Sequence, residues 1–152
     1  MGFKKTFITE DKIRLKILDF LSRREHSFKE LTDKLKDRVE SEENLLEELT
    51  KLKEENLQSD ERFTESYTRT RSVKGFGPDK ISFELKSRGI SENLINKIVY
   101  SDEINWMEII RKEFKKKFNI INDLDKEDIS RAKKFLLQRG FEFDQINQLF
   151  KQ

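Results

Sequence analysis

A segment near the middle of the chain recurs 51 positions later, and this repetition restricts the folds that the chain can adopt. Repeats of this length are typical of stacked copies of one small helical unit. Such proteins present extended surfaces, so the repeat favours a groove-binding partner over a catalytic pocket. The matching pairs are Leu85 and Leu136, Arg88 and Arg139, Gly89 and Gly140, Ile95 and Ile146, and Asn96 and Asn147.

Apolar residues at helical spacing predict nine helices in three groups of three, with repeats at residues 1–59, 60–102 and 103–152. The first repeat aligns with the second at an offset of 50 and diverges most, because Val39 stands where a glycine is expected. The predicted fold class is therefore all-α, three tandem three-helix repeats forming an elongated, curved and monomeric array.

Local signals place several helix ends. Ser27 and Glu30 predict a capping box, and Ser41 and Ser91 are predicted N-caps. Pro78 is suited to the first position of a helix, because its missing N–H needs no partner there. The repeated glycines are predicted helix stops. Inner faces are predicted at Leu94, Ile95, Ile98 and Val99 of one helix, and at Phe143, Ile146, Leu149 and Phe150 of the last.

Charge is abundant but unevenly distributed along the chain. Charged residues make up 41% of the sequence and hydrophobic residues 34%, which fits several small cores better than one large core. Residues 61–101 hold 8 basic and 5 acidic side chains, whereas residues 1–60 hold 13 and 15. A net charge of +2 is too mild for a dedicated duplex-DNA binder and allows an acidic protein partner or a weaker nucleic-acid role.

The sequence contains no cysteine, which excludes disulfides and fits a reducing cytosol. Residues 1–10 lack the apolar core of a signal peptide, and no apolar stretch approaches the roughly 20 residues of a membrane span. A cytoplasmic protein is the expectation.

Basic side chains with an interleaved tyrosine form the candidate binding surface. Arg and Tyr are common at interfaces, and Arg binds carboxylate or phosphate in a bidentate manner. A solvated helix face with internal ion pairs explains such a cluster equally well. The candidate residues are Tyr67, Arg69, Arg71, Lys74 and Arg88, with Arg131, Lys134 and Arg139 in the corresponding part of the third repeat.

Catalytic, metal and cofactor sites are not predicted. His26 is the single histidine and precedes a predicted cap, so a zinc site is not predicted and a turn residue is expected. Asp123, Asp125, Glu127 and Asp128 lack the EF-hand pattern, and a helix N-terminus explains them. No nucleophile–base pair or phosphate-binding glycine loop is recognisable, so an enzyme is not expected.

Three segments carry a family resemblance that covers nearly the whole chain. They are FLSRREHSFKELTDKL at residues 20–35, RFTESYTRTRSVKGFGPDKISFELKSRGI at 62–90 and RAKKFLLQRGFEFDQINQLF at 131–150. With them the chain resembles RecX, the bacterial regulators of the RecA recombinase. Ser72, Asp79 and Glu84 make the middle segment less basic than in many members.

The resemblance implies tandem three-helix repeats that lie in the groove of the RecA–DNA filament. It implies a modulator, most often an inhibitor, of RecA ATPase, strand exchange and co-protease activity in DNA repair, homologous recombination and the SOS response. The expected partner is the RecA filament, with weak direct contact to its DNA.

Two alternatives come from other classes. A helical transcription regulator would use residues 78–88 as a recognition helix. Against it, this segment mixes acids with bases and offers no Asn or Gln for base edges. A protein-interaction scaffold without a role in recombination is the second alternative.

Overall fold

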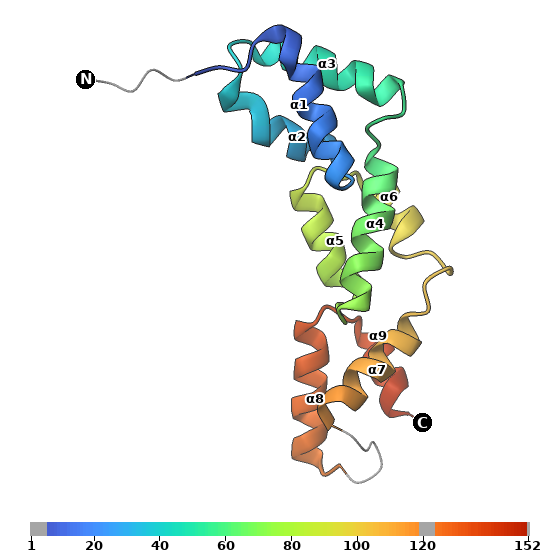
Figure 1. Ribbon diagram of the computed structural model, residues 1–152. Helices are drawn as coiled ribbons and strands as arrows, with labels where there is room; N and C mark the ends of the chain where they lie inside the picture. The colour runs from blue at the N-terminus through green and yellow to red at the C-terminus, as the bar shows by residue number, and fades with distance from the viewer. Residues whose placement is uncertain (1–5, 119–123, 152) are drawn as a thin grey trace, which may run out of the picture. The chain divides into compact units, whose positions relative to one another are not determined.

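The computed structural model describes residues 6–118 and 124–151. Nine α-helices and one 3₁₀ turn form within these residues, without a β-strand, so the all-α prediction is confirmed (Figure 1). The helices are α1 (Glu10–Arg23), α2 (Phe28–Leu35), α3 (Glu42–Glu54), α4 (Asp60–Val73), α5 (Pro78–Ser87), α6 (Glu92–Ile98), α7 (Trp106–Phe118), α8 (Lys126–Gln138) and α9 (Phe143–Phe150).

Side-chain caps fix the starts of several helices. Ser27 accepts from the backbone N–H of Glu30, whose carboxylate accepts from the N–H of Ser27, so the predicted capping box is present at α2. Ser41 and Ser91 cap α3 and α6 as predicted. Asp125 caps α8, which confirms the helix-start interpretation of the acidic run. Asp123 of that run lies outside the described residues.

Two compact units can be distinguished by their internal contacts. The first comprises residues up to Thr64 together with Arg88–Ile90, and the second comprises Glu65–Ser87 and Ser91 onward. Helix α4 runs from one into the other. The boundaries of three repeats at 59/60 and 102/103 stay a prediction.

Helices α1, α2 and α3 of the first unit surround one apolar core (Figure 1). Val39, at the position where glycine was expected, is buried and forms an isolated parallel bridge with Ile8. A 3₁₀ turn at Lys36–Arg38 leads into it. The fully enclosed residues come from all three helices at helical spacing and are Ile13, Ile17, Leu31, Leu35, Leu45, Leu49 and Leu52.

In the second unit α7, α8 and α9 pack against one another, and α5 packs against α6 (Figure 1). Phe114 is fully buried and meets the ring of Phe150 edge-on, with ring centroids 5.5 Å apart. The indole N–H of the buried Trp106 donates to the carbonyl of Val99 at 2.9 Å, so its polar atom is satisfied. None of the described helices is long and apolar enough to cross a bilayer.

The repeated glycines make the same contact in two places. Gly89 and Gly140 have φ values of +80° and +97°, which confirms them as helix stops in the left-handed region. A Cβ at Gly89 would lie 2.7 Å from Cβ of Lys29, and a Cβ at Gly140 would lie 2.3 Å from Cβ of Lys80. Lys29 and Lys80 are themselves 51 positions apart. The repeat therefore preserves a close contact as well as a helix end.

Four of the predicted inner residues are not fully buried. Phe143 is 69% exposed, because it is the first residue of α9 and precedes the buried face that starts at Ile146. Leu94, Ile98 and Phe150 are half-buried, whereas Ile95, Val99, Ile146 and Leu149 are buried. Helix α6 is too short to bury more than one narrow face.

Candidate partner-binding surface

Arg71 on α4 is held by neighbours in the second unit. Its Nε and Nη2 atoms donate to the two carboxylate oxygens of Glu84 on α5 at 3.0 and 2.9 Å. Its guanidinium also lies 3.9 Å from the ring centre of Phe76. Both ends of the ion pair are only about a fifth exposed, 22% for Arg71 and 19% for Glu84. A bidentate pair of this kind ties α4 to α5.

Arg139 follows α8 and holds the loop between α4 and α5. Its Nη2 atom donates to the buried carboxylate of Glu113 at 2.7 Å and to the carbonyl of Lys74 at 3.0 Å. Its guanidinium lies over the ring of Phe76 at 4.4 Å, so two arginines contact one phenylalanine. The backbone completes the contact, because Gly77 N–H donates to the carbonyl of Arg139 at 2.8 Å.

Arg88 belongs to the first unit and is half-buried. Its Nε atom lies 3.8 Å from Glu30, and its carbonyl accepts from the hydroxyl of Ser27 at 2.8 Å. Burial and the Arg24 guanidinium have opposite effects on the pKa of the Glu30 carboxyl group. Burial raises the pKa of that carboxyl, and hydrogen bonds from Arg24 and from the Ser27 backbone lower it, with a net lowering. Glu30 is therefore charged at neutral pH.

Arg69 and Lys74 lie on the exposed side of the chain near the end of α4. Within residues 6–118 and 124–151 neither side chain makes an ion pair. Tyr67, two residues before Arg69, is half-buried. The basic segment thus separates into arginines that hold helices together and cations that face solvent.

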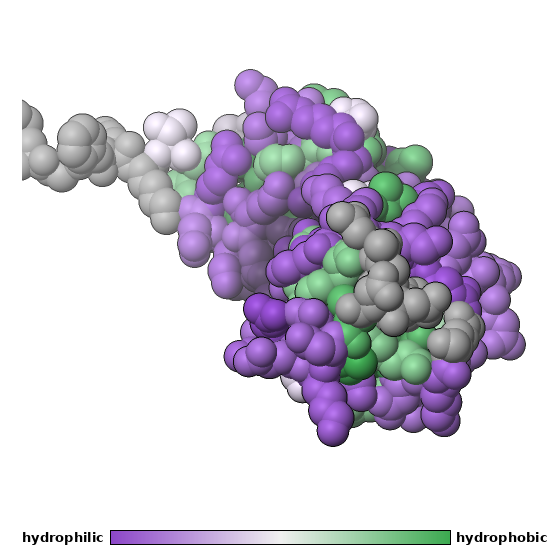
Figure 2. Space-filling model, turned by 90° about the horizontal axis from the view of Figure 1, so that it is seen from below, coloured by the Kyte–Doolittle hydropathy of each residue, from purple (hydrophilic) through white to green (hydrophobic). Residues whose placement is uncertain are grey.

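The two candidates on α8 lie on the wall of one cavity. Arg131 and Lys134 line a space of about 490 Å³ together with Lys117, Phe118 and Phe135. Arg131 pairs with Asp128 one turn earlier, and Lys117 lies 4.0 Å from the ring centre of Phe135. Figure 2 views the second unit from below, where hydrophilic residues dominate and apolar residues gather in a central area.

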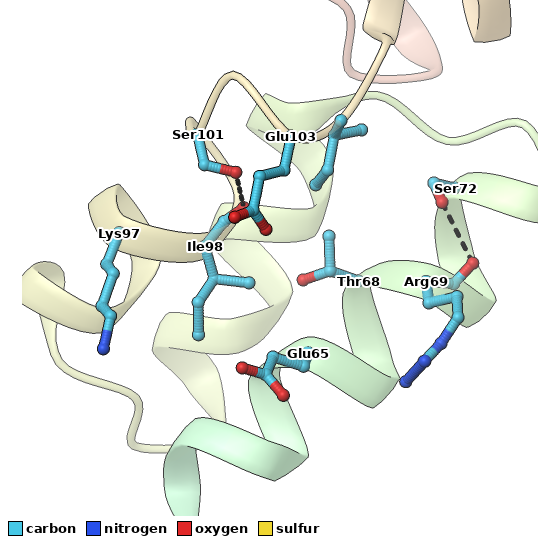
Figure 3. Close-up of a pocket in the computed structure, with 9 residues that line it drawn as sticks. Glu65, Thr68, Arg69, Ser72, Lys97, Ile98, Ser101 and Glu103 are labelled. Atoms are coloured by element: carbon cyan, nitrogen blue, oxygen red, sulfur yellow. Dashed lines mark hydrogen bonds between the residues drawn. The ribbon is translucent and has the colours of Figure 1, made fainter.

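A larger cavity, of about 740 Å³, lies beside Arg69. Helix α4 contributes Glu65, Thr68, Arg69 and Ser72, α6 contributes Lys97 and Ile98, and the following loop contributes Ser101, Glu103 and Ile104 (Figure 3). All of these belong to the second unit. Of this set, the sequence analysis identified Arg69 alone as a site residue. Glu65, one turn before Arg69, is the signal that could have indicated a mixed-charge surface.

Groups of three or more potential metal-ligating side chains are not found within the described part of the chain. The chemistry on offer is ion pairing and hydrogen bonding at surface cavities and along exposed helix faces. Fold and surface together define a class of protein: a helical repeat protein built from three-helix units.

Comparison with known proteins identifies the family within this class. Residues 59–98 match the family model described as RecX, second three-helix domain, and residues 103–150 match RecX, third three-helix domain. Two relatives called Regulatory protein RecX are 38% identical in Legionella pneumophila and 39% in Pseudomonas putida. The alignments cover 89% of this chain and 90% of the Legionella protein, and 90% of this chain and 88% of the Pseudomonas protein.

A crystal structure of RecX from Lactobacillus salivarius superposes with a TM-score of 0.78 at 26% identity, over 93% of this chain and 94% of that one. The chain belongs to the RecX family.

Proposed function

We propose that this chain binds the RecA–DNA filament in the cytoplasm and inhibits the recombinase, ATPase and co-protease activities of RecA. The observation that carries the proposal is 38% identity over nearly the full length to a protein named Regulatory protein RecX. Helical repeat proteins commonly present extended surfaces, which suits a filament groove. As a monomer the chain would contact several RecA protomers, and many modest contacts would add up through avidity.

The exposure and ion pairs of the candidate residues indicate which of them can contact the filament directly. Arg69, Lys74 and Lys134 are exposed and make no ion pair within the described residues, so we assign them direct contact with the filament. Arg71 and Arg139 act by positioning, because their guanidinium groups are held by Glu84 and Glu113. The remaining candidates, Tyr67, Arg88 and Arg131, stay in the proposed surface.

The test is RecA ATP hydrolysis and strand exchange on single-stranded DNA, titrated with this protein. The double variant Arg69→Glu, Lys74→Glu should raise the half-inhibitory concentration about tenfold, since loss of about 1.4 kcal/mol of binding free energy has that effect. Arg71→Glu is unsuitable for this test, because it would set two carboxylates against each other at the α4–α5 contact.

The matched control is Lys112→Glu, Lys115→Glu, which makes the same charge change at two exposed positions of α7. It should inhibit as the natural protein does, and both variants should retain the far-UV helical signal. Equal inhibition by the Arg69→Glu, Lys74→Glu variant and the natural protein would show that the end of α4 is not part of the interface.

A further inference from the structure

The cavity beside Arg69 contains a buried hydroxyl without a partner. Thr68 is 1% exposed, and its Oγ1 atom has no hydrogen-bond partner among the described residues. Figure 3 shows this hydroxyl on the side of Thr68 that faces the other residues of the cavity wall. An unpaired buried hydroxyl destabilises a fold unless a ligand or water supplies a hydrogen bond. Its presence at the wall of a cavity therefore marks a position where a ligand or water can supply that hydrogen bond.

Two carboxylates lie on either side of this hydroxyl. Glu65 comes from α4 and Glu103 from the loop after α6, and both carboxylates point into the space that Thr68 faces (Figure 3). Neither makes an ion pair within the described residues. The hydroxyls of Ser101 and Ser72 do not add free donors, because they donate to the carbonyls of Ile98 and Arg69 at 3.0 Å.

The rest of the wall combines two isoleucines with Lys97. Ile98 and Ile104 are half-buried and line the cavity next to the acidic groups. The side chains that combine a long apolar stem with a cationic end are Lys and Arg, whose stems lie along apolar surface while the charged group reaches polar atoms. The apolar part of the wall fits the stem of such a side chain, and the two carboxylates and the hydroxyl can accept hydrogen bonds from its cationic end.

We propose that this cavity is a socket for a Lys or Arg side chain of a protein partner. The ligand's cation would lie between Glu65 and Glu103 and donate a hydrogen bond to Thr68 Oγ1. The lining also holds the cations Lys97 and Arg69, so the two carboxylates disfavour a nucleic-acid phosphate at the position between them rather than throughout the cavity. Arg69, at the edge of the cavity, then faces an acidic residue of the same partner segment. The inference rests on the proposed function for its partner, the protein component of the filament, and on the cavity alone for its chemistry.

The chemistry is tested without RecA, by NMR of the full chain labelled at Ile and Thr methyl groups. The probe is Nα-acetyl-lysine methylamide, compared with inorganic phosphate and a short oligothymidylate. The lysine probe should shift the methyl signals of Thr68, Ile98 and Ile104 in a saturable way. No saturable shift with the lysine probe, or larger shifts with phosphate or oligonucleotide, would overturn the proposal.

Variants distinguish the specific contribution of Glu65 and Glu103 to probe binding from the effect of net charge. Glu65→Gln, Glu103→Gln should weaken probe binding at least about tenfold, because two charge-assisted hydrogen bonds are lost. The control Glu108→Gln, Glu127→Gln makes the same charge change at exposed residues of α7 and α8 and should bind the probe unchanged. Equal loss in both variants would reduce the effect to net charge and contradict a socket.

Thr68→Val tests the hydroxyl against its stability cost. The variant should unfold at a higher temperature than the natural protein, because an unpaired buried hydroxyl is removed without changing shape, and should bind the probe more weakly. Higher stability with undiminished probe binding would show that Oγ1 plays no part in the socket.

The partner is tested by RecA inhibition with Glu65→Gln, Glu103→Gln. Weaker inhibition than by the control variant supports a RecA side chain in the socket, and equal inhibition contradicts it while leaving the proposed function intact. If the natural protein fails to inhibit RecA, the proposed function fails, and the NMR titration still decides whether the socket binds a cation.

Discussion

Arg69 and Arg71 lie two positions apart on α4 and have different environments. Arg71 makes two hydrogen bonds to Glu84 and covers Phe76, so its guanidinium is part of the packing between α4 and α5. Arg69 is exposed and lies at the edge of the Thr68 cavity. On a helix two residues apart point in directions about 200° apart, because each residue turns the chain by about 100°. One position therefore serves stability and the other is available to a partner.

His26, which the sequence places in a turn, is buried in the structure. It is 2% exposed, Nδ1 lies 3.0 Å from the carbonyl of Arg24, and Nε2 lies 3.3 Å from Nζ of Lys34. Burial lowers the pKa of His26, and the positive charges of Arg24 and Lys34 lower it further. The hydrogen bond with the Arg24 carbonyl and the charge of Glu30 act in the opposite direction, and the net shift is downward. The neutral ring fits both contacts, with Nδ1–H donating to the carbonyl and Nε2 accepting from Lys34.

This environment predicts a pH dependence of stability. The folded-state pKa of His26 lies below its unfolded value of about 6.5, so the folded chain binds the proton less readily than the unfolded chain. The stabilisation is complete above about pH 6.5 and is lost as pH falls through the folded pKa. Urea unfolding should show a larger drop in unfolding free energy between about pH 7.5 and 5.5 for the natural protein than for His26→Gln. Parallel pH profiles of the two proteins would contradict this.

At the scale of elements, the loop between α4 and α5 is fixed by the residues that follow α8. Gly75 has a φ of +91°, and a Cβ there would fall 2.0 Å from the carboxylate carbon of Glu113. The carboxylate occupies that space and binds Arg139. The motif KGFG and the motif QRG, which are 65 residues apart at Lys74 and Arg139, therefore form one joint within the second unit.

This joint predicts that replacing Arg139 and replacing Arg131 will change the free energy of unfolding by different amounts. Arg139→Ala should lower the free energy of unfolding by about 2 kcal/mol or more, because it leaves the buried Glu113 with only the longer contact to Lys116. Arg131→Ala, which removes an exposed pair with Asp128, should change it by less than about 0.5 kcal/mol. Urea denaturation of both variants measures the difference.

A double-variant cycle provides the control for this joint. Adding Glu113→Gln to Arg139→Ala removes the unpaired charge, so the second change should cost less than it does in the natural protein. Strict additivity of the two changes would show that the pair does not couple.

At the scale of the molecule, charge is balanced rather than concentrated. The net charge of +2 comprises 32 basic and 30 acidic residues. Of the eight candidate residues, four basic ones are paired with acids inside their own unit. A surface of this kind favours a protein partner with charges of both signs over a bare polyanion.

Binding to bare duplex DNA should therefore be weak and without sequence preference. We expect dissociation constants of about 10⁻⁴–10⁻⁶ M near physiological salt, measured by fluorescence anisotropy, with a shallow dependence on salt because few phosphates are neutralised. Tight sequence-specific binding of about 10⁻⁸ M would instead support the transcription-regulator alternative. Binding to RecA-coated DNA in the same assay distinguishes the filament from the duplex.

The sequence by itself determined the helices and their ends. Capping by Ser27, Ser41 and Ser91, the start at Pro78 and the stops at Gly89 and Gly140 are set by residues within a turn of each other. The helical repeat class follows from the same local signals and their spacing, because periodic apolar residues must face a core wherever that core lies.

Only the tertiary structure decided which charged residues are available. Arg71 meets an acid 13 residues away and Arg139 meets one 26 residues away, distances in sequence at which no local pattern predicts contact. The same holds for the socket, whose walls at Thr68, Ile98 and Glu103 come from two helices and a loop. Pairing and cavities depend on where separate segments meet in space, and that is set by packing rather than by spacing along the chain.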